Sequence, residues 1–256
     1  PQVNLLPLYG DAASKDTFDK LVAEACGVQE EDLLSTDLFL YNRMKPAVWG
    51  AHNEYMSCAK LDDLECAFSS LKAFVKGGNK ESVSVCAIFD NEEVGSATPE
   101  GAASTLLRDV LRRIAGALDV DEEGYQMLLS RSMLVSADNA HAIHPNHPEL
   151  SDKDNAPRLN GGIVLKFSAP RRYATDGGSA AAFRALCRRA DVPVQTMANR
   201  SDLPGGSTLG SIAGTLVPVS AVDIGLAQLA MHAAVEVMGA EDYPRLIAAM
   251  RQFYKE

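Results

Sequence analysis

The sequence lacks any apolar run that is long enough to cross a membrane. Its longest mostly apolar stretches, such as Val83 to Phe89, have the length of a strand, whereas a membrane-spanning helix needs about 18 residues. Positive charge is also scarce, since 24 Lys and Arg residues stand against 34 Asp and Glu residues and the formal net charge is −10. We therefore expect neither a membrane nor nucleic acid as a partner.

Cysteine is present, but its spacing is not typical of a disulfide framework or of a zinc site built from thiolates. The five cysteines are widely spaced, their number is odd, and no two of them form a CxxC pair. This argues against a disulfide framework and against a zinc site built from thiolates, and it favours a cytoplasmic location. The first residues, Pro1 to Asn4, lack an initiator Met and a signal peptide, so we expect the chain to start partway through a longer protein.

Helical and strand-like apolar spacings alternate along the chain, and this rhythm predicts an α/β fold. Helices are predicted over residues 14–25, where Gly27 ends the helix, and over 64–75, 102–118, 179–190, 226–237 and 242–254. Strands are predicted over residues 33–41, 83–89, 132–136, 162–167, 192–197 and 215–219.

Acidic residues and histidines gather where these predicted elements begin or end. The carboxyl ends of strands form the ligand crevice of open α/β sheets, and carboxylates brought together there repel one another unless a cation or protons intervene. A set of Asp, Glu and His without thiolates suits zinc, manganese or cobalt. The residues concerned are Asp62, Asp63, Glu92, Glu93, Asp138, His141 and His232.

Each of these residues also has a plainer interpretation. Asp63 and, less readily, Asp62 could cap the start of a helix. Glu92 and Glu93, taken alone, fit a solvated turn. His232, taken alone on a predicted helix rich in Leu, Ala and Met, fits a core histidine better than a metal ligand.

Several ordered segments resemble the aspartyl aminopeptidase family, a branch of the co-catalytic metallo-exopeptidases. The matching segments are residues 59–64 (AKLDDL), 89–96 (FDNEEVGS), 136–146 (SADNAHAIHPN), 172–175 (RYAT), 202–210 (DLPGGSTLG) and 228–232 (QLAMH). The resemblance implies a mixed central sheet flanked by helices, of the zinc-exopeptidase type. It also implies that residues 1–48 are the C-terminal remnant of a dimerisation domain and that residues 49–256 are the C-terminal part of a catalytic domain. The family forms homo-oligomers in which dimers build a dodecamer.

The resemblance further implies roles for individual residues around two divalent metal ions, zinc first, with manganese or cobalt as alternatives. Asp62 corresponds to the carboxylate that bridges the two ions, whereas Asp63 orients the helix start. Glu93 and His232 correspond to ligands of one ion, and Asp138 corresponds to a ligand of the other. The neighbouring Glu92 matches the general base that takes a proton from the metal-activated water and returns it to the leaving amine.

By the same resemblance, His141, Lys166 and Tyr173 lie near the substrate. Lys166 is the candidate partner for an acidic side chain, although it could also be an ordinary surface lysine at a strand end. The glycine-rich stretch 204–208 could let the backbone approach the substrate.

One family motif is missing. The family's His-x-Asp motif, which supplies the remaining histidine ligand of one metal, does not occur in the sequence, since His52 is followed by Asn53 and Glu54. We therefore expect a C-terminal portion that binds at most one metal well and that has little or no activity alone.

The leading interpretation is a metal-dependent aminopeptidase that removes N-terminal Asp or Glu residues from peptides. One alternative is a catalytically incomplete fragment that serves as an assembly or binding module, which the missing His-x-Asp motif favours. Another is a broad-specificity metallo-aminopeptidase, which a Lys166 that does not face the pocket would favour.

Overall fold

The computed structural model describes residue 4, residues 6–203 and residues 205–256. The chain divides into two compact units, Pro1–Tyr41 and Asn42–Glu256. Among the described residues, no helix combines the length and the apolar character that crossing a membrane requires.

The first unit contains the helix α1, Phe18–Cys26, between the short 3-10 helices η1, Ala12–Ser14, and η2, Glu30–Asp32. The predicted helix stop is confirmed, because α1 ends at Gly27 in the left-handed conformation, with a φ of 71°. The strand predicted over 33–41 is wrong. These residues pair with no described strand, and Leu34 and Phe39 are exposed. Apolar alternation suits a strand, but it does not provide the partner that a hydrogen-bonded ladder needs.

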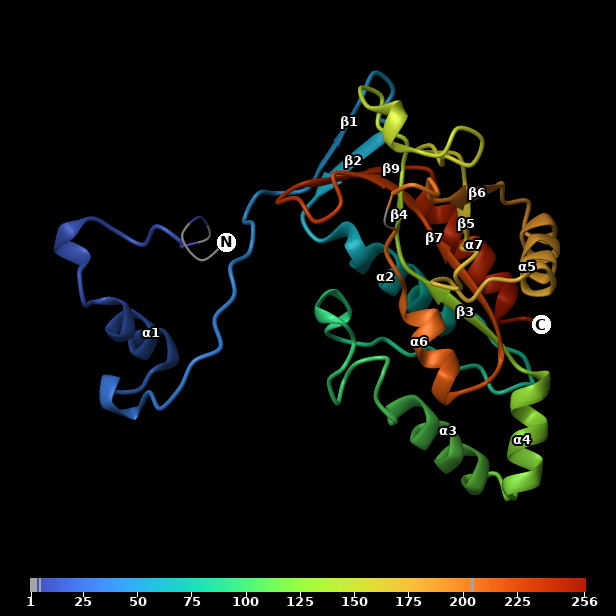
Figure 1. Ribbon diagram of the computed structural model, residues 1–256. Coiled ribbons are helices and arrows are strands. Elements are labelled where there is room, and N and C mark those ends of the chain that lie inside the picture. Colours follow the sequence, from blue (N-terminus) through green and yellow to red (C-terminus); the bar gives the residue numbers. More distant parts are fainter. Residues whose placement is uncertain (1–3, 5, 204) are drawn as a thin grey trace. The chain divides into compact units, whose positions relative to one another are not determined.

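The framework of the second unit is a pair of sheets (Figure 1). The strands are β1 Ala47–Trp49, β2 Tyr55–Cys58, β3 Met133–Ala137, β4 Ala140–His141, β5 Ile163–Phe167, β6 Val194–Ala198, β7 Ser220–Gly225, β8 Ala227–Leu229 and β9 Glu236–Gly239. One sheet has the order β3-β7-β5-β6, and the other has the order β1-β2-β9-β8-β4. In the first sheet β7 runs parallel to β3 and antiparallel to β5, which confirms the predicted mixed sheet.

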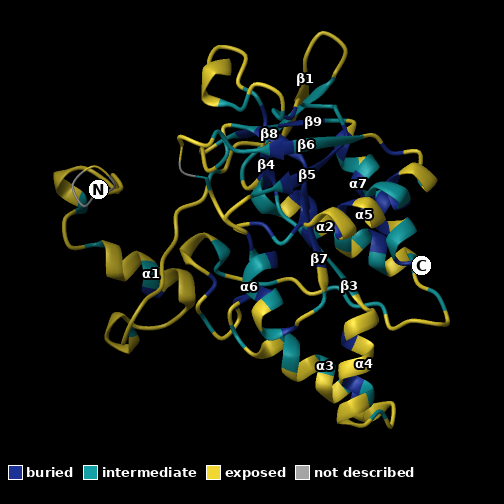
Figure 2. Cartoon of the chain, turned by 45° about the vertical axis from the view of Figure 1, so that its right-hand side comes forward, coloured by how far each residue is buried: buried dark blue, intermediate teal, exposed yellow. Residues whose placement is uncertain are grey.

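Four helices of the described chain lie against the four-stranded sheet, namely α2 Leu61–Lys76, α5 Gly177–Arg189, α6 Leu209–Leu216 and α7 Asp242–Phe253. Helices α3 Leu106–Ala117 and α4 Glu122–Arg131 pack together in a separate apolar cluster with Leu216 and Val217. Two 3-10 helices, η3 Glu92–Val94 and η4 Pro148–Leu150, lie in the connecting segments. Helix α7 packs against both α2 and α5. The main core joins strands β5 and β7 to these helices through Leu165, Phe183, Ile224 and Leu246. Figure 2 shows buried residues concentrated in the sheets and in the inner faces of α5 and α7.

Two strand predictions fail in the second unit. Residues 83–89 run without a paired strand in the described chain, and Val83 and Ile88 are exposed. The strand predicted over 215–219 is displaced, because α6 extends to Leu216 and β7 begins only at Ser220. The apolar run of α6 is compatible with either type of element, and its length and packing decide between them.

The helix predicted over 226–237 is also wrong, and this error concerns the site directly. The segment forms β8, a turn and β9, in which Gln228 pairs with Met238 and Leu229 pairs with Val237. The second strand of this pair also lies antiparallel to β2. The pairings of β9 with β2 and of β8 with β4, which are far away in the chain, override the helical spacing of the apolar residues.

Candidate metal centre

The first candidate ligand, Asp62, lies in the distorted opening turn of α2. Lys60 before it is in the left-handed conformation, Asp62 and Asp63 have non-helical dihedral angles, and the peptide bond between these two aspartates is cis. Neither residue caps the helix. Instead, one oxygen of each carboxylate, Oδ1, is buried without a hydrogen-bond partner among the described residues.

His232 reaches the same point from a different element. It lies in the turn between β8 and β9, not in the predicted helix, and its φ is 66°. Its Nε2 is 3.0 Å from Oδ2 of Asp62 and 3.1 Å from Oε2 of Glu93, which belongs to η3. One donor atom from each of the three residues lies within 4.8 Å of the other two. The three predicted ligands of one metal are therefore adjacent.

A second group of carboxylates shares Asp62. Oxygens of Asp62, Asp63 and Asp138 also lie within 4.8 Å of one another. Asp138 follows the end of β3, and its neighbour Asn139 donates a hydrogen bond of 3.0 Å to the carbonyl of Leu61. This bond connects the loop after β3 to the start of α2. The resemblance implies that Asp63 orients the helix start and is not itself a ligand, and the sequence alone predicts no role for Asn139.

The charges at this site fit a bound cation. Burial, followed by the nearby charge of Asp138 and a hydrogen bond with Glu93, raises the pKa of Asp62 from 3.8 to about 7. Burial and the charge of Asp138 also raise the pKa of Asp63 well above its ordinary value. Carboxylates so close together must hold protons or share a cation. Because the donors are carboxylate oxygens and an imidazole nitrogen, and because Asp62 and Asp63 each keep one buried oxygen without a hydrogen-bond partner among the described residues, the residues present suit zinc.

The predicted general base, Glu92, precedes Glu93 in η3 and is half-buried. Burial is the main cause that raises the pKa of Glu92, and the charges of Asp138 and Glu93 add to it. A carboxylate with a raised pKa exchanges protons more readily near neutral pH. An ordinary solvated turn does not account for two observations: the charge of Asp138 acts on Glu92, and Glu93 lies 3.1 Å from His232.

Two of the three predicted substrate residues lie together. Lys166 on β5 is only 2% exposed, so it is not a surface lysine. Its Nζ lies 3.1 Å from Oδ2 of Asp138 and 5.5 Å from the centre of the Tyr173 ring. The Lys166 ammonium thus lies between Tyr173, a predicted substrate residue, and Asp138, a member of the second carboxylate group.

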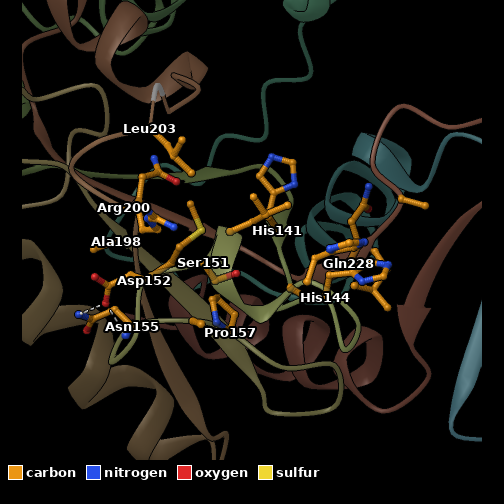
Figure 3. Close-up of a pocket in the computed structure, with 18 residues that line it drawn as sticks. His141, His144, Ser151, Asp152, Asn155, Pro157, Ala198, Arg200, Leu203 and Gln228 are labelled. Atoms are coloured by element: carbon orange, nitrogen blue, oxygen red, sulfur yellow. Dashed lines mark hydrogen bonds between the residues drawn. The ribbon is translucent and has the colours of Figure 1, made fainter.

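The third substrate candidate, His141, lines a neighbouring cavity. Burial lowers the pKa of His141, and the positive charges of Lys166 and His232 add to this effect. Figure 3 shows His141, Gln228 and Arg200 among the side chains around this cavity, whose volume is about 320 Å³.

The predicted glycine-rich stretch begins at Pro204, which lies outside the described residues. Its described part is held by the buried carboxylate of Asp223, a residue to which the sequence alone assigns no role. Oδ1 of Asp223 accepts a 2.7 Å hydrogen bond from the Thr208 hydroxyl, and Oδ2 accepts one from the backbone N–H of Ala174. Asp223 therefore ties the glycine-rich stretch to the segment that carries Tyr173.

Comparison with known proteins finds one family along nearly the whole chain. A family model described as aminopeptidase I zinc metalloprotease (M18) matches residues 9–254. Among curated proteins, probable M18 family aminopeptidase 2 of Clostridium novyi is 40% identical over 257 residues, which cover 99% of this chain and 59% of that protein. Its counterpart in Mycobacterium leprae is 39% identical over 254 residues, which cover 99% of this chain and 60% of that protein.

Among solved structures, the mApe1 dodecamer of S. cerevisiae superposes with a TM-score of 0.80 at 28% identity, covering 97% of this chain and 58% of that one. The chain thus spans about three fifths of the length of the proteins it matches.

Proposed function

The chain belongs to the M18 family of aminopeptidase I zinc metalloproteases, and we propose that it forms part of an aminopeptidase that removes N-terminal Asp or Glu residues from peptides. The observation that carries the proposal is the convergence of Asp62, Glu93 and His232 from three separate elements. Nothing in local sequence brings these residues together, since Asp62 and His232 are 170 positions apart.

In the proposed reaction this chain supplies ligands and a proton carrier. Zinc, when bound, polarises the peptide carbonyl and lowers the pKa of water. Asp62, Glu93 and His232 would hold one ion, while Asp62 and Asp138 would contribute to a second. Glu92 accepts a proton from the attacking water and delivers it to the leaving amine, a role that contributes roughly 10²–10⁴-fold to the rate in other enzymes.

The preference for acidic residues is assigned to Lys166, with His141 and Tyr173 beside the substrate. A buried ammonium strongly favours a carboxylate over a neutral side chain, because the surroundings screen charge less than water does. The contact between Lys166 and Asp138 supports a second candidate, an aminopeptidase of broad specificity, since in this structure the lysine already has an anionic partner.

We also propose that residues 1–48 belong to a dimerisation domain and residues 49–256 to a catalytic domain. The division of the chain between Tyr41 and Asn42 supports a boundary in this region. The dodecamer of the S. cerevisiae relative supports a homo-oligomeric assembly.

The test is to measure zinc per chain and the hydrolysis of Asp-, Glu- and Leu-anilide in the same sample. We expect about one zinc per chain, lost in His232→Ala and retained in His52→Ala, which changes an exposed histidine of the β1–β2 turn. Faster cleavage of Asp- and Glu-anilide supports acidic specificity, and equal rates support the broad-specificity candidate. Bound zinc without turnover supports the incomplete-fragment interpretation, and absence of zinc from the unaltered chain contradicts the metal centre.

A further inference from the structure

One buried carboxylate outside the predicted site contacts two of the candidate ligands. Glu236 begins β9 opposite Cys58 of β2, and it is 2% exposed. Its Oε2 accepts a 2.9 Å hydrogen bond from the backbone N–H of Asp62, and its Oε1 accepts a 2.7 Å hydrogen bond from the backbone N–H of His232. The two oxygens of a single side chain therefore hold the backbones whose side chains meet 3.0 Å apart in the candidate metal centre.

Both N–H groups lie where regular structure supplies no hydrogen-bond acceptor for them. The N–H of Asp62 lies in the first turn of α2, where amide groups have no partner within the helix. His232 lies outside regular structure in the left-handed region, which a non-glycine residue seldom adopts without local support. A hydrogen bond to a carboxylate is roughly twice as strong as one between neutral groups, so Glu236 is well suited to hold both segments.

We propose that Glu236 is a positioning residue, which sets the separation of Asp62 and His232 and thereby the affinity of the site for zinc. This inference rests on the proposed function, because it assumes that the two side chains are ligands. Glu236 belongs to neither group of candidate ligand atoms among the described residues, and both of its oxygens are engaged by backbone N–H groups. Its contribution is to fix two ligand backbones that come from distant parts of the chain.

The structure also contains a matched control. Asp242, at the start of α7, is fully buried and likewise accepts two backbone N–H groups, from Asn160 at 2.6 Å and from Gly162 at 2.8 Å. It holds a turn that carries none of the candidate ligands. A substitution at Asp242 therefore reports the cost of losing such an anchor away from the candidate ligands, together with the loss of its 3.1 Å ion pair with Arg245.

The experiment measures zinc affinity by competition with a chelator for the unaltered chain, Glu236→Gln, Glu236→Asp and Asp242→Asn, with folding checked by circular dichroism. Glutamine keeps the shape but replaces one acceptor with an amide that cannot accept an N–H. Aspartate keeps the charge but is too short to reach both N–H groups. We expect both Glu236 variants to weaken zinc binding roughly 10–100-fold, the range found for partners of metal ligands, and Asp242→Asn to leave it unchanged.

Hydrogen exchange in the zinc-free chain gives a readout that does not depend on metal. The amides of residues 230–235 should exchange faster in both Glu236 variants and at the original rate in Asp242→Asn. Unchanged zinc affinity in Glu236→Gln overturns the proposal, as does a loss in Glu236→Gln that Glu236→Asp fully restores, since charge alone would then explain it. If the unaltered chain binds no zinc, the metal centre itself is refuted, which is a distinct result.

Discussion

The ammonium of Lys166 lies 3.1 Å from Oδ2 of Asp138, and this ion pair joins β5 to the loop after β3. Burial by itself would lower the pKa of Lys166, but the interactions with the charge of Asp138 and with the neighbouring Tyr173 outweigh it, and the net pKa is raised. Lys166 is therefore charged at neutral pH. It balances part of the negative charge that Asp62, Asp63 and Asp138 concentrate beside it.

Removing this lysine should destabilise the zinc-free chain. Lys166→Met leaves the carboxylate of Asp138 without its cation, and breaking a buried pair in this way costs about 3–5 kcal/mol in other proteins. We expect the free energy of unfolding to decrease by an amount near the lower end of this range, because the Asp138 side chain is 16% exposed and water partly screens its charge. Urea denaturation in the presence of a chelator measures it. The double variant with Asp138→Asn should recover part of the loss, and strictly additive losses would show that the pair is not coupled.

Stability of the zinc-free chain should fall as pH rises from about 4 to about 8. Burial, and then the charges of Asp242, Asp62 and Glu236, raise the pKa of Glu65 from 4.5 to about 8. In this interval the folded chain retains a proton on Glu65 that the unfolded chain releases, so the free energy of unfolding decreases with pH. The full contribution of the proton is present below the unfolded pKa and is lost by the time pH passes the folded pKa.

Glu65→Gln should flatten this dependence, because the amide mimics the protonated carboxyl. We expect the variant to match the unaltered chain near pH 4 and to exceed it near pH 8 by on the order of 3 kcal/mol. Thermal unfolding across this pH range, with a chelator present, measures the difference. Glu123→Gln on the exposed face of α4 is the control. An unchanged pH profile in Glu65→Gln would assign the titration to another group.

Substitutions of the adjacent residues Glu92 and Glu93 should have different effects, one on turnover and the other on zinc binding. In a preparation that shows turnover, Glu92→Gln should lower kcat by roughly 10²–10⁴-fold without reducing bound zinc, because it removes only the proton carrier. Glu93→Gln should reduce bound zinc, because its Oε2 belongs to the group around His232. Steady-state kinetics together with metal analysis measure both effects. Loss of zinc in Glu92→Gln would contradict the division of roles.

The two glycines of helix α6 should respond in opposite directions to alanine. A Cβ at Gly210 would lie 2.5 Å from Oδ1 of Asp223 and 2.7 Å from Cβ of Ser136, so Gly210→Ala should destabilise the chain by about 1–3 kcal/mol. A Cβ at Gly214 meets nothing within 4 Å, and Gly214→Ala should stabilise the helix by about 0.5–1 kcal/mol. Urea midpoints measure both changes. A stabilising Gly210→Ala would refute the close approach of α6 to β7.

Helices with a clear apolar period and a local stop were predictable, as α1 with Gly27 and the helix α7 show. Strand β5 was also predictable, because its apolar residues are buried on both faces. The segments 33–41 and 83–89 have equally suitable residues, yet neither is paired with another described strand. Strand formation depends on a neighbour, and no local pattern specifies whether that neighbour is present.

Side-chain identity and short-range spacing are sufficient to predict the types of residue available for chemistry, the family resemblance and the α/β class. The position of His232 in a turn, the burial of Lys166 against Asp138 and the contacts of Glu236 with two candidate ligands become visible only in the folded chain. Each of these depends on contacts between residues far apart in the chain. Their distances follow from how sheets and helices pack, not from the order of residues along any one element.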